Sequence, residues 1–256
     1  MTKRLLHKWH GAGNDFLVDV TTNEGADFWS PALAAAVCHR TLGVGADGLL
    51  VAALDAERVT MTLYNADGSI AEMSGNGARC LAAAVARHWG EQITNVLVDT
   101  LAGERLVHIE LRGDEGYGFL EMGQVTFADT IEGALGVAGV GNPHVVLMDD
   151  ASWQRSDREA LAQRLSDAVG GANVEFVTVL DPSHVSLSVY ERGVGWTMAC
   201  GTGSVASTAV LRRAGLVGDQ VRVSNPGGDL VVELRGDQAT LAGPVRFVAD
   251  ITWSVA

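Results

Sequence analysis

Tyr64-Asn65-Ala66-Asp67-Gly68-Ser69-Ile70-Ala71-Glu72-Met73-Ser74-Gly75-Asn76-Gly77 is the stretch that decides how this chain is organised, because its pattern occurs twice. In the second copy, Tyr190-Glu191 is followed after eight residues by Cys200-Gly201-Thr202-Gly203. The two copies are 126 residues apart (200 − 74), which is close to half of the 256-residue chain. A repeat of this length indicates two similar halves.

Each copy connects a strand-like run to a helical run. The alternating segments 59–64 and 185–190 predict strands, and the small-residue segments Ala78 to His88 and Ser204 to Arg213 predict helices. A nucleophile-type side chain followed by Gly-x-Gly at a helix start places a proton-transfer group beside backbone N–H donors. Two such units facing each other would hold one carboxylate and place a base on either side of its α-carbon.

Composition favours a soluble enzyme. The chain is 47% hydrophobic with a formal net charge of −13, and its acidic residues are dispersed. Nucleic acids and anionic membranes require a basic face, so neither is an expected partner. The N-terminal segment 1–8 has no apolar signal core, and no apolar run of membrane-spanning length occurs. We expect a cytoplasmic protein with a small-molecule substrate.

Cysteine and lysine usage limits the available chemistry. Cys38, Cys80 and Cys200 form no CxxC pair, which argues against a disulfide framework or a zinc–cysteine site. Cys38 and Cys80 lie in helical runs and are expected in the core. The only lysines are Lys3 and Lys8, and nothing near Lys8 resembles a phosphate site. Chemistry at an amino-acid α-carbon would therefore proceed without pyridoxal phosphate, and we expect neither a metal nor an organic cofactor.

The remaining segments predict an α/β (α+β) fold. Helices are expected at Pro31 to Arg40, with Ser30 as N-cap, and at Ser156 to Ala168. Gly43 to Gly48 spells GxGxxG, but it follows a helix and precedes a strand, so a turn is favoured over a nucleotide site. The glycine-rich stretch 113–118 is the expected linker. The predicted domains are 1–115 with 246–256, and 116–245.

Several segments together resemble one known family. They run in the family's order through nearly the whole chain and comprise His10 to Phe16, Gly43 to Gly48, Tyr64 to Ser69, Glu72 to Arg79, Gly141 to His144, Asn173 to Phe176, Tyr190 to Gly193, Ala199 to Gly203 and Pro226 to Gly228. On these motifs the chain resembles the diaminopimelate epimerases, of the cofactor-independent amino-acid racemase and epimerase superfamily. The resemblance implies two pseudo-symmetric domains, each a barrel-like sheet around a central helix. It also implies an active site in the cleft between them and a homodimer.

The resemblance also implies residue roles in the interconversion of LL- and meso-diaminopimelate, a step toward lysine and peptidoglycan. Two acid/base residues act on opposite faces of one α-carbon, and the matching positions here are Ser74 and Cys200. The α-carboxylate is expected at the N–H groups of Gly75, Asn76, Gly201 and Thr202, and the α-ammonium at Glu191. The distal end of the substrate is expected at Asn65, Asn173 and Arg192, with Asn14 and Asn142 nearby and His144 supporting.

Two positions depart from the family pattern. Ser74 replaces a cysteine, and a serine hydroxyl is far less acidic than a thiol, whose pKa is about 8.5. Three explanations stay open: a cysteine-to-serine variant, a natural serine–cysteine pair, or a changed substrate. Trp196 stands where the family has glutamate, and packing is favoured over reshaping of the site. The alternatives are thus a racemase, epimerase or dehydratase for another amino acid, or an impaired form that binds without turnover.

Each candidate residue also has a purely structural explanation. Ser74 could serve only as an N-cap and Cys200 only as a buried thiol, although their matched positions favour a functional pair. His144 is equally consistent with a core histidine and with a site residue. Asn14 and Asn65 could stabilise turns. Glu191 and Arg192 could pair with each other.

Overall fold

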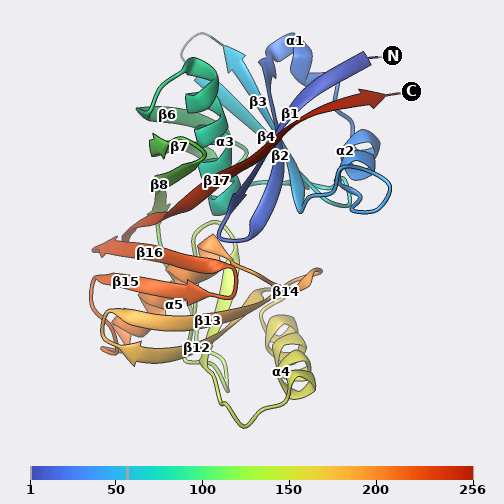
Figure 1. Cartoon of the computed structure of the whole chain (residues 1–256). Helices are drawn as coiled ribbons and strands as arrows, with labels where there is room; N and C mark the ends of the chain where they lie inside the picture. Colours follow the sequence, from blue (N-terminus) through green and yellow to red (C-terminus); the bar gives the residue numbers. More distant parts are fainter. Residues whose placement is uncertain (1, 56–57, 256) are drawn as a thin grey trace. The chain divides into compact units, whose positions relative to one another are not determined.

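The computed structural model describes residues 2–55 and 58–255, which form two compact units (Figure 1). Unit 1 contains Met1–Glu121 with Gly243–Ala256, and unit 2 contains Met122–Ala242. The sequence placed these boundaries at 115/116 and 245/246. Both transitions lie inside strands that continue without a break, β8 (Glu115–Gln124) and β17 (Gln238–Val255). Because the chain continues as a strand through each unit boundary, no change in amino-acid composition marks either boundary.

Unit 1 is an eight-stranded barrel. Its strands pair in the order β17-β1-β2-β3-β4-β6-β7-β8, and β8 pairs with β17 to close the series. The pairs β2–β3 and β4–β6 are parallel. The pairs β1–β17, β1–β2, β3–β4, β6–β7 and β7–β8 are antiparallel. The strands are β1 (Thr2–Gly11), β2 (Asn14–Thr22), β3 (Gly48–Asp55), β4 (Arg58–Asn65), β6 (Ile93–Thr100) and β7 (Gly103–Arg112), with β5 (Ile70–Ala71) beside β4.

Helix α3 (Gly75–Trp89) forms the centre of this barrel. Every residue from Gly75 to Ala86 is buried, and the helix contacts β1, β2, β3, β4, β6 and β7. A helix enclosed on all sides needs small apolar residues, and the segment 81–86 supplies them (Leu-Ala-Ala-Ala-Val-Ala). The helix ends at Gly90, whose φ of 77° is the left-handed conformation that favours glycine.

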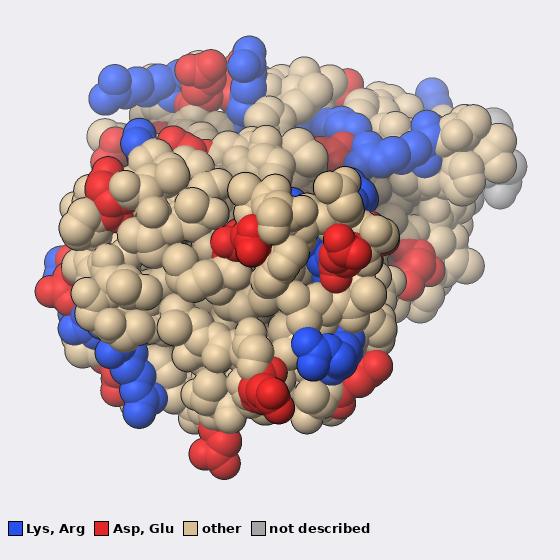
Figure 2. Space-filling view, turned by 90° about the horizontal axis from the view of Figure 1, so that it is seen from below, with Lys and Arg blue, Asp and Glu red and all other residues tan. Residues whose placement is uncertain are grey.

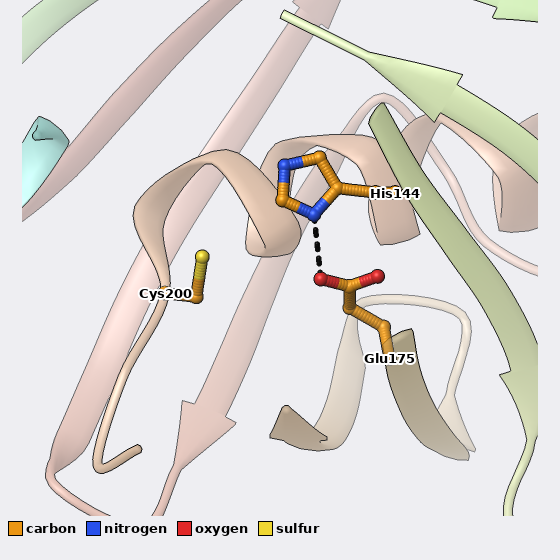
Figure 3. A group of neighbouring side chains, drawn as sticks. All are labelled: His144, Glu175 and Cys200. Carbon is orange, nitrogen blue, oxygen red and sulfur yellow. Dashed lines mark hydrogen bonds and ion pairs between the residues drawn. The ribbon is translucent and has the colours of Figure 1, made fainter. Parts of the chain in front are cut away.

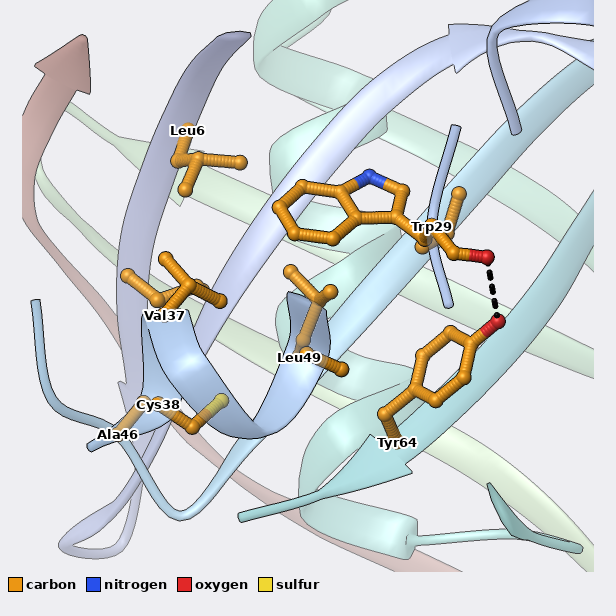
Figure 4. Packing of buried hydrophobic residues seen from close by; sticks show 10 residues of the cluster. Leu6, Trp29, Val37, Cys38, Ala46, Leu49 and Tyr64 are labelled. Carbon is orange, nitrogen blue, oxygen red and sulfur yellow. Dashed lines mark hydrogen bonds between the residues drawn. The ribbon is translucent and has the colours of Figure 1, made fainter. Parts of the chain in front are cut away.

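A second helix packs on the outside of the same strands. Helix α2 (Pro31–Cys38) begins as predicted, because Ser30 Oγ accepts a hydrogen bond from Leu33 N. Its Val37 and Cys38 pack against Leu49 in a cluster that Tyr64 and Trp29 complete, with Tyr64 Oη donating to the Trp29 carbonyl at 3.4 Å (Figure 4). The helix stops two residues earlier than the predicted Arg40. A four-residue helix, α1 (Asn23–Ala26), was not predicted.

Unit 2 repeats the arrangement. Its strands pair in the order β9-β10-β11-β12-β13-β15-β16-β17, with β11–β12 and β13–β15 parallel. Helix α5 (Gly201–Arg213) contacts β10, β11, β12 and β16, so the sheet wraps around it. The other elements are β9 (Thr126–Ala128), β10 (Gly136–Gly139), β11 (Pro143–Met148), α4 (Arg155–Ala168), β12 (Asn173–Asp181), β13 (His184–Glu191), β14 (Gly195–Thr197), β15 (Gln220–Asn225) and β16 (Gly228–Arg235).

The two units match element by element. Strand β4 (58–65) shifted by 126 residues is β13 (184–191), and α3 and α5 both follow a short strand, β5 or β14. Each central helix connects two parallel strands, which pair at Val59–Val98 in unit 1 and at Val185–Val223 in unit 2. The predicted fold class is thus confirmed: two pseudo-symmetric units, each with a strand-rich sheet around a central helix.

The predicted linker at 113–118 is wrong. Only Gly113 and Asp114 form a turn, and Gly116 and Gly118 lie inside strand β8. A Cβ at Gly118 would stand 2.9 Å from Cδ of the buried Arg79 in α3. The glycine therefore permits close approach of strand and helix, and glycine content alone does not distinguish this from a flexible connection.

Other local predictions are confirmed. Residues 43–47 form a loop that leads into β3 at Gly48, rather than a strand-to-helix phosphate turn. The segment Asn225-Pro226-Gly227-Gly228 predicts a hairpin turn from its sequence, and Asn225 pairs with Gly228 across two central residues. The last strand returns to unit 1, where Thr2 pairs with Val255.

Charged side chains are dispersed on the face shown in Figure 2. Lys and Arg alternate there with Asp and Glu, and no continuous basic patch appears. This face therefore lacks the electrostatic footprint of a nucleic-acid binder. Among the residues described, none of the helices has both the length and the apolar composition needed to span a bilayer.

Candidate functional site

Ser74 and Cys200 occupy the same structural position, the N-cap of the central helix of their unit. Their backbones are nearly identical, with φ/ψ of −137°/124° at Ser74 and −123°/115° at Cys200. Ser74 Oγ accepts a hydrogen bond from Gly77 N at 3.0 Å, and Cys200 Sγ accepts one from Gly203 N at 3.4 Å. Ser74 Oγ and Cys200 Sγ therefore each lie at the positive end of a helix dipole.

The second glycine of each Gly-x-Gly motif makes this geometry possible. A Cβ at Gly77 would lie 3.1 Å from Ser74 Cβ, and one at Gly203 would lie 3.3 Å from Cys200 Cβ. Both spacings are tighter than ordinary contacts, so a larger residue would push the N-cap side chain off the helix start. In an anion site, the N–H groups of the first helical turn point at the ligand.

In unit 1, an asparagine pair flanks Ser74. Asn76 Nδ2 donates to Asn14 Oδ1 at 3.3 Å, and Arg79 donates to Asn76 Oδ1 at 2.8 Å. Asn14 in turn donates to Asp47 Oδ2 at 2.8 Å. The Asn14 amide is thus oriented by one hydrogen bond at its oxygen and one at its nitrogen. It connects Asp47, in the loop before β3, to the start of α3.

Salt bridges fix that loop. Arg40 bridges Asp15 at 2.6 Å and Asp47 at 2.7 Å. Lys8 bonds Asp15 at 2.9 Å and the Gly45 carbonyl at 2.7 Å, so its amine is engaged in a structural network. Despite the effect of burial, hydrogen bonds from Arg40 and Lys8 hold the pKa of Asp15 below its ordinary value.

Two further polar side chains of unit 1 differ in exposure. Asn65 ends β4 and is exposed, and its Nδ2 donates to Ser69 Oγ at 3.0 Å, which stabilises a turn. Arg79 is fully buried one turn into α3, where it donates to the Gly75 carbonyl at 3.2 Å. Burial lowers the pKa of Arg79 to about 10. Its guanidinium places positive charge under the helix start beside Ser74.

In unit 2, the Cys200 thiol stands among carboxylates. Burial raises its pKa well above the ordinary value, and the charges of Glu191 and Glu175 add to that rise. A contact with Thr202 Oγ1 at 3.4 Å and the Gly203 N–H act in the opposite direction. Burial and the two carboxylates thus favour the neutral thiol over the thiolate at Cys200.

Glu191 lies at the end of β13. Thr197 Oγ1 donates to Glu191 Oε1 at 2.7 Å. Burial raises the pKa of Glu191, opposed first by this hydrogen bond, and the negative charge of Glu175 raises it further. No ion pair joins Glu191 to Arg192 among the described residues, so the structural pairing considered from the sequence is absent there.

His144 belongs to a fully buried polar group. Its Nδ1 lies 2.6 Å from Glu175 Oε1, and its Nε2 lies 3.1 Å from Asn142 Oδ1. Both side chains of the His144–Glu175 pair are 0% exposed. Cys200 completes the group: Figure 3 shows its thiol near the imidazole and carboxylate, and one potential ligand atom from each residue lies within 4.8 Å of the others.

Two of the residues expected at the distal end of the substrate, Asn173 and Arg192, meet within unit 2, whereas Asn65 belongs to unit 1. Arg192 N donates to Asn173 Oδ1 at 3.0 Å, and Arg192 Nη1 donates to the Gly171 carbonyl at 3.2 Å. Arg192 lines a pocket of about 510 Å³ together with Asp167 and Tyr190. The exposed guanidinium at this pocket is available to pair with a carboxylate.

Trp196 packs within unit 2. Its ring lies 5.5 Å from the rings of Phe176 and Tyr190, and its Nε1 donates to Glu159 Oε1 at 2.7 Å. The packing role favoured from the sequence agrees with these contacts.

Sequence reasoning missed Glu175, Thr197 and Asp47 as members of these groups. The signal for Glu175 was available, because a glutamate stands inside the otherwise apolar run Val174-Glu175-Phe176-Val177. A charged residue in a buried strand requires a partner. The partners of Asp47 and Thr197 depend on contacts between separate segments, which local patterns do not reveal.

The fold and these sites can be compared with known proteins. The family model described as diaminopimelate epimerase matches residues 6–128 and 136–248. A diaminopimelate epimerase from Xanthomonas euvesicatoria pv. vesicatoria (strain 85-10) is 38% identical over 278 residues, covering 96% of this chain and 95% of the relative. A similar fold occurs in a hydroxyproline epimerase from Agrobacterium vitis (TM-score 0.73, 16% identity, 99% of this chain and 91% of that one). A PhzF-family phenazine biosynthesis protein from Bacillus anthracis also shares it (TM-score 0.74, 14% identity, 100% of both chains).

The fold of two strand-rich units, each around a central helix, is thus shared with an epimerase and with a phenazine biosynthesis protein. The sequence matches then identify the family, which the fold alone does not. The chain belongs to the diaminopimelate epimerase family, and it is an isomerase.

Proposed function

We propose that this enzyme interconverts LL- and meso-diaminopimelate without an organic cofactor or metal, using Ser74 and Cys200 on opposite faces of the α-carbon. The observation that carries the proposal is their matched N-cap position at α3 and α5. Family membership supplies the substrate class. The proposal requires both side chains to face one α-carbon in the working enzyme.

The α-carboxylate would bind at the two helix starts. The N–H groups of Gly75, Asn76, Gly201 and Thr202 are the expected donors, because they belong to the first turns of α3 and α5. Negative charge that develops when the α-proton leaves would be stabilised by both helix dipoles.

The rest of the substrate would be held by polar side chains of both units. Glu191 would bind the α-ammonium, whose positive charge favours the ionised carboxylate. Asn173 and Arg192, joined by a hydrogen bond, would bind the distal end, and Arg192 suits its carboxylate. Asn14, Asn65 and Asn142 would complete the polar contacts.

Proton transfer is unequal on the two faces. Cys200 is a protonated thiol at the start of the reaction and can donate to a carbanion. It would act as base in the opposite direction when a neighbour accepts its proton, and Glu191, whose charge acts on the Cys200 thiol, would be that acceptor. A serine hydroxyl is a much weaker acid than a thiol, so removal of the α-proton by Ser74 requires a proton acceptor.

The two alternatives differ in their support. A different amino-acid substrate was suggested by Trp196, but its contacts with Phe176, Tyr190 and Glu159 account for it through packing. A form that binds without turnover is favoured by Ser74 itself, because a serine hydroxyl is a far weaker acid than a thiol.

Solvent-deuterium exchange at the α-carbon tests the proposal. We expect exchange with LL- and meso-diaminopimelate, loss of exchange in Cys200→Ala, and faster exchange in Ser74→Cys, because a thiol ionises far more readily than a hydroxyl. Ser74→Ala is the matched control. Binding without exchange in both the parent and Ser74→Cys would support the silent form, and exchange only with other amino acids would support a changed substrate.

We also propose a homodimer located in the cytoplasm. Family resemblance supports the dimer, and the proposed substrate, a biosynthetic amino acid, supports the location. Sedimentation equilibrium measures the assembly directly, and a monomer at micromolar concentration would contradict the proposed dimer.

A further inference from the structure

The group His144, Glu175 and Cys200 has the composition of a metal site. The three side chains come from β11, β12 and the N-cap of α5, all within unit 2 (Figure 3). Each offers one ligand atom, and these atoms lie within 4.8 Å of one another. Imidazole, carboxylate and thiolate together form a donor set that Zn²⁺ accepts.

Glu175 has unused acceptor capacity in this group. Its Oε2 is buried and has no hydrogen-bond partner among residues 2–55 and 58–255. Buried carboxylate oxygens are normally satisfied. A Cβ at Gly203 would stand 2.5 Å from Glu175 Oε1, which shows how closely the carboxylate packs against the start of α5. The carboxylate is therefore confined beside the Cys200 helix.

His144 is bonded in a way that suits a metal ligand. Asn142 Oδ1 accepts from Nε2, which fixes the proton there. The remaining nitrogen, Nδ1, shares a proton with Glu175 Oε1 across 2.6 Å. Replacing that proton by a cation would leave the Asn142 contact unchanged, and an outer hydrogen bond of this kind is common for zinc-bound histidines.

We propose that this group binds Zn²⁺ and that the bound ion inhibits the enzyme by capturing Cys200. Two protons leave: one from the Cys200 thiol and one shared by His144 and Glu175. The thiolate, the carboxylate and the neutral imidazole then surround the dication, so the occupied site carries no net charge, which suits its burial. Water supplies the fourth ligand. Zinc–ligand bonds of about 2.0–2.3 Å require Cys200 to move toward His144 and Glu175, and the 2.6 Å contact between Nδ1 and Oε1 to open so that the ion enters between them. The inhibition, but not the binding, rests on the proposed role of Cys200.

Titration of the full chain with Zn²⁺ and with Co²⁺ tests the site. We expect one ion per chain and release of about two protons on Zn²⁺ binding, measured by calorimetry in buffers of different ionisation enthalpy. Co²⁺ should give a sulfur-to-metal charge-transfer band. That band should vanish in Cys200→Ser and weaken together with affinity in Glu175→Gln, whereas the matched control Cys80→Ala, at a buried thiol elsewhere, should keep it.

Circular dichroism confirms that each variant is folded, and His144→Asn provides a second ligand deletion if Glu175→Gln is unstable. A Co²⁺ spectrum without the charge-transfer band, or one that persists in Cys200→Ser, would overturn the site. If Zn²⁺ binds through Cys200 but α-carbon exchange continues undiminished, the site stands and the catalytic role of Cys200 fails. Recovery of α-carbon exchange when a chelator is added supports both the Zn²⁺ site and the catalytic role of Cys200.

Discussion

Ser74 and Cys200 share one backbone geometry, so the difference between the two sites lies in single side chains and their neighbours. Ser74 has Arg79 beneath its helix start, whereas Cys200 has Glu175 and Glu191 beside its thiol. The positive charge of Arg79 thus lies near the serine hydroxyl, which is the weaker acid. The negative charges of Glu175 and Glu191 lie near the cysteine thiol, which is the stronger acid. The two sets of neighbours thus reduce the difference in acidity between hydroxyl and thiol.

Glu191→Gln should change both thiol reactivity and stability. Removing this negative charge lowers the pKa of Cys200 toward its ordinary value, so more thiolate is present at mildly alkaline pH. We expect several-fold faster alkylation of Cys200 by iodoacetamide, measured by mass spectrometry in a Cys38→Ala, Cys80→Ala background. An unchanged rate would show that Glu191 does not influence the thiol.

The stability effect has a defined sign. Burial raises the pKa of Glu191 in the folded state, so the wild-type chain loses stability as pH rises from the unfolded value, about 4.3, through the folded one. Glu191→Gln should therefore unfold at higher temperature than wild type at neutral pH, and the difference should disappear below pH ~4. An equal difference at both pH values would exclude this origin.

Individual residues were predictable where local chemistry defines them. The positions of Ser74 and Cys200 at helix starts followed from the Gly-x-Gly pattern, and the N-cap role of Ser30 followed from its position before Pro31. Glu175 required the observation that a charge interrupts an apolar strand. The Asn14–Asp47 hydrogen bond joins residues 33 positions apart, so only the fold reveals it.

At the scale of elements, strand β8 shows why glycine is ambiguous in a sequence. Gly116 and Gly118 predicted a linker, yet they are strand residues that lie against Leu111 and Arg79. By contrast, the repeat predicted the strand–helix–strand units correctly, because periodicity and helix starts are local properties.

Gly118→Ala should destabilise the chain. The added Cβ would meet Arg79 Cδ at 2.9 Å in a fully buried position, and overpacking of this kind costs about 1–3 kcal/mol. Urea unfolding measures the loss. Gly218→Ala is the matched control, since its nearest neighbour would be 3.8 Å away. Equal stability of the two variants would show that Arg79 moves aside without cost.

For the whole molecule, the pairing of Thr2 with Val255 places both ends of the chain on adjacent strands, β1 and β17 (Figure 1). A circular permutant that joins them by a short linker and opens between Leu101 and Ala102, in the β6–β7 turn, should fold. We expect an unchanged circular dichroism spectrum and cooperative unfolding. A permutant opened between Leu81 and Ala82, inside buried α3, is the control and should not fold. Failure of both would show that continuity of β6 and β7 is required.

The closing strand of unit 1 also sets an order of events during translation. Unit 2, residues 122–242, is continuous and can be completed while the ribosome is still adding residues. Unit 1 lacks residues 243–255 until all of unit 2 has been synthesised, and the strand they form pairs with β1. Until then, the rest of unit 1 lacks the strand that closes its barrel around the apolar helix α3. Chaperones that bind exposed apolar surface should recognise this chain until strand β17 has been synthesised.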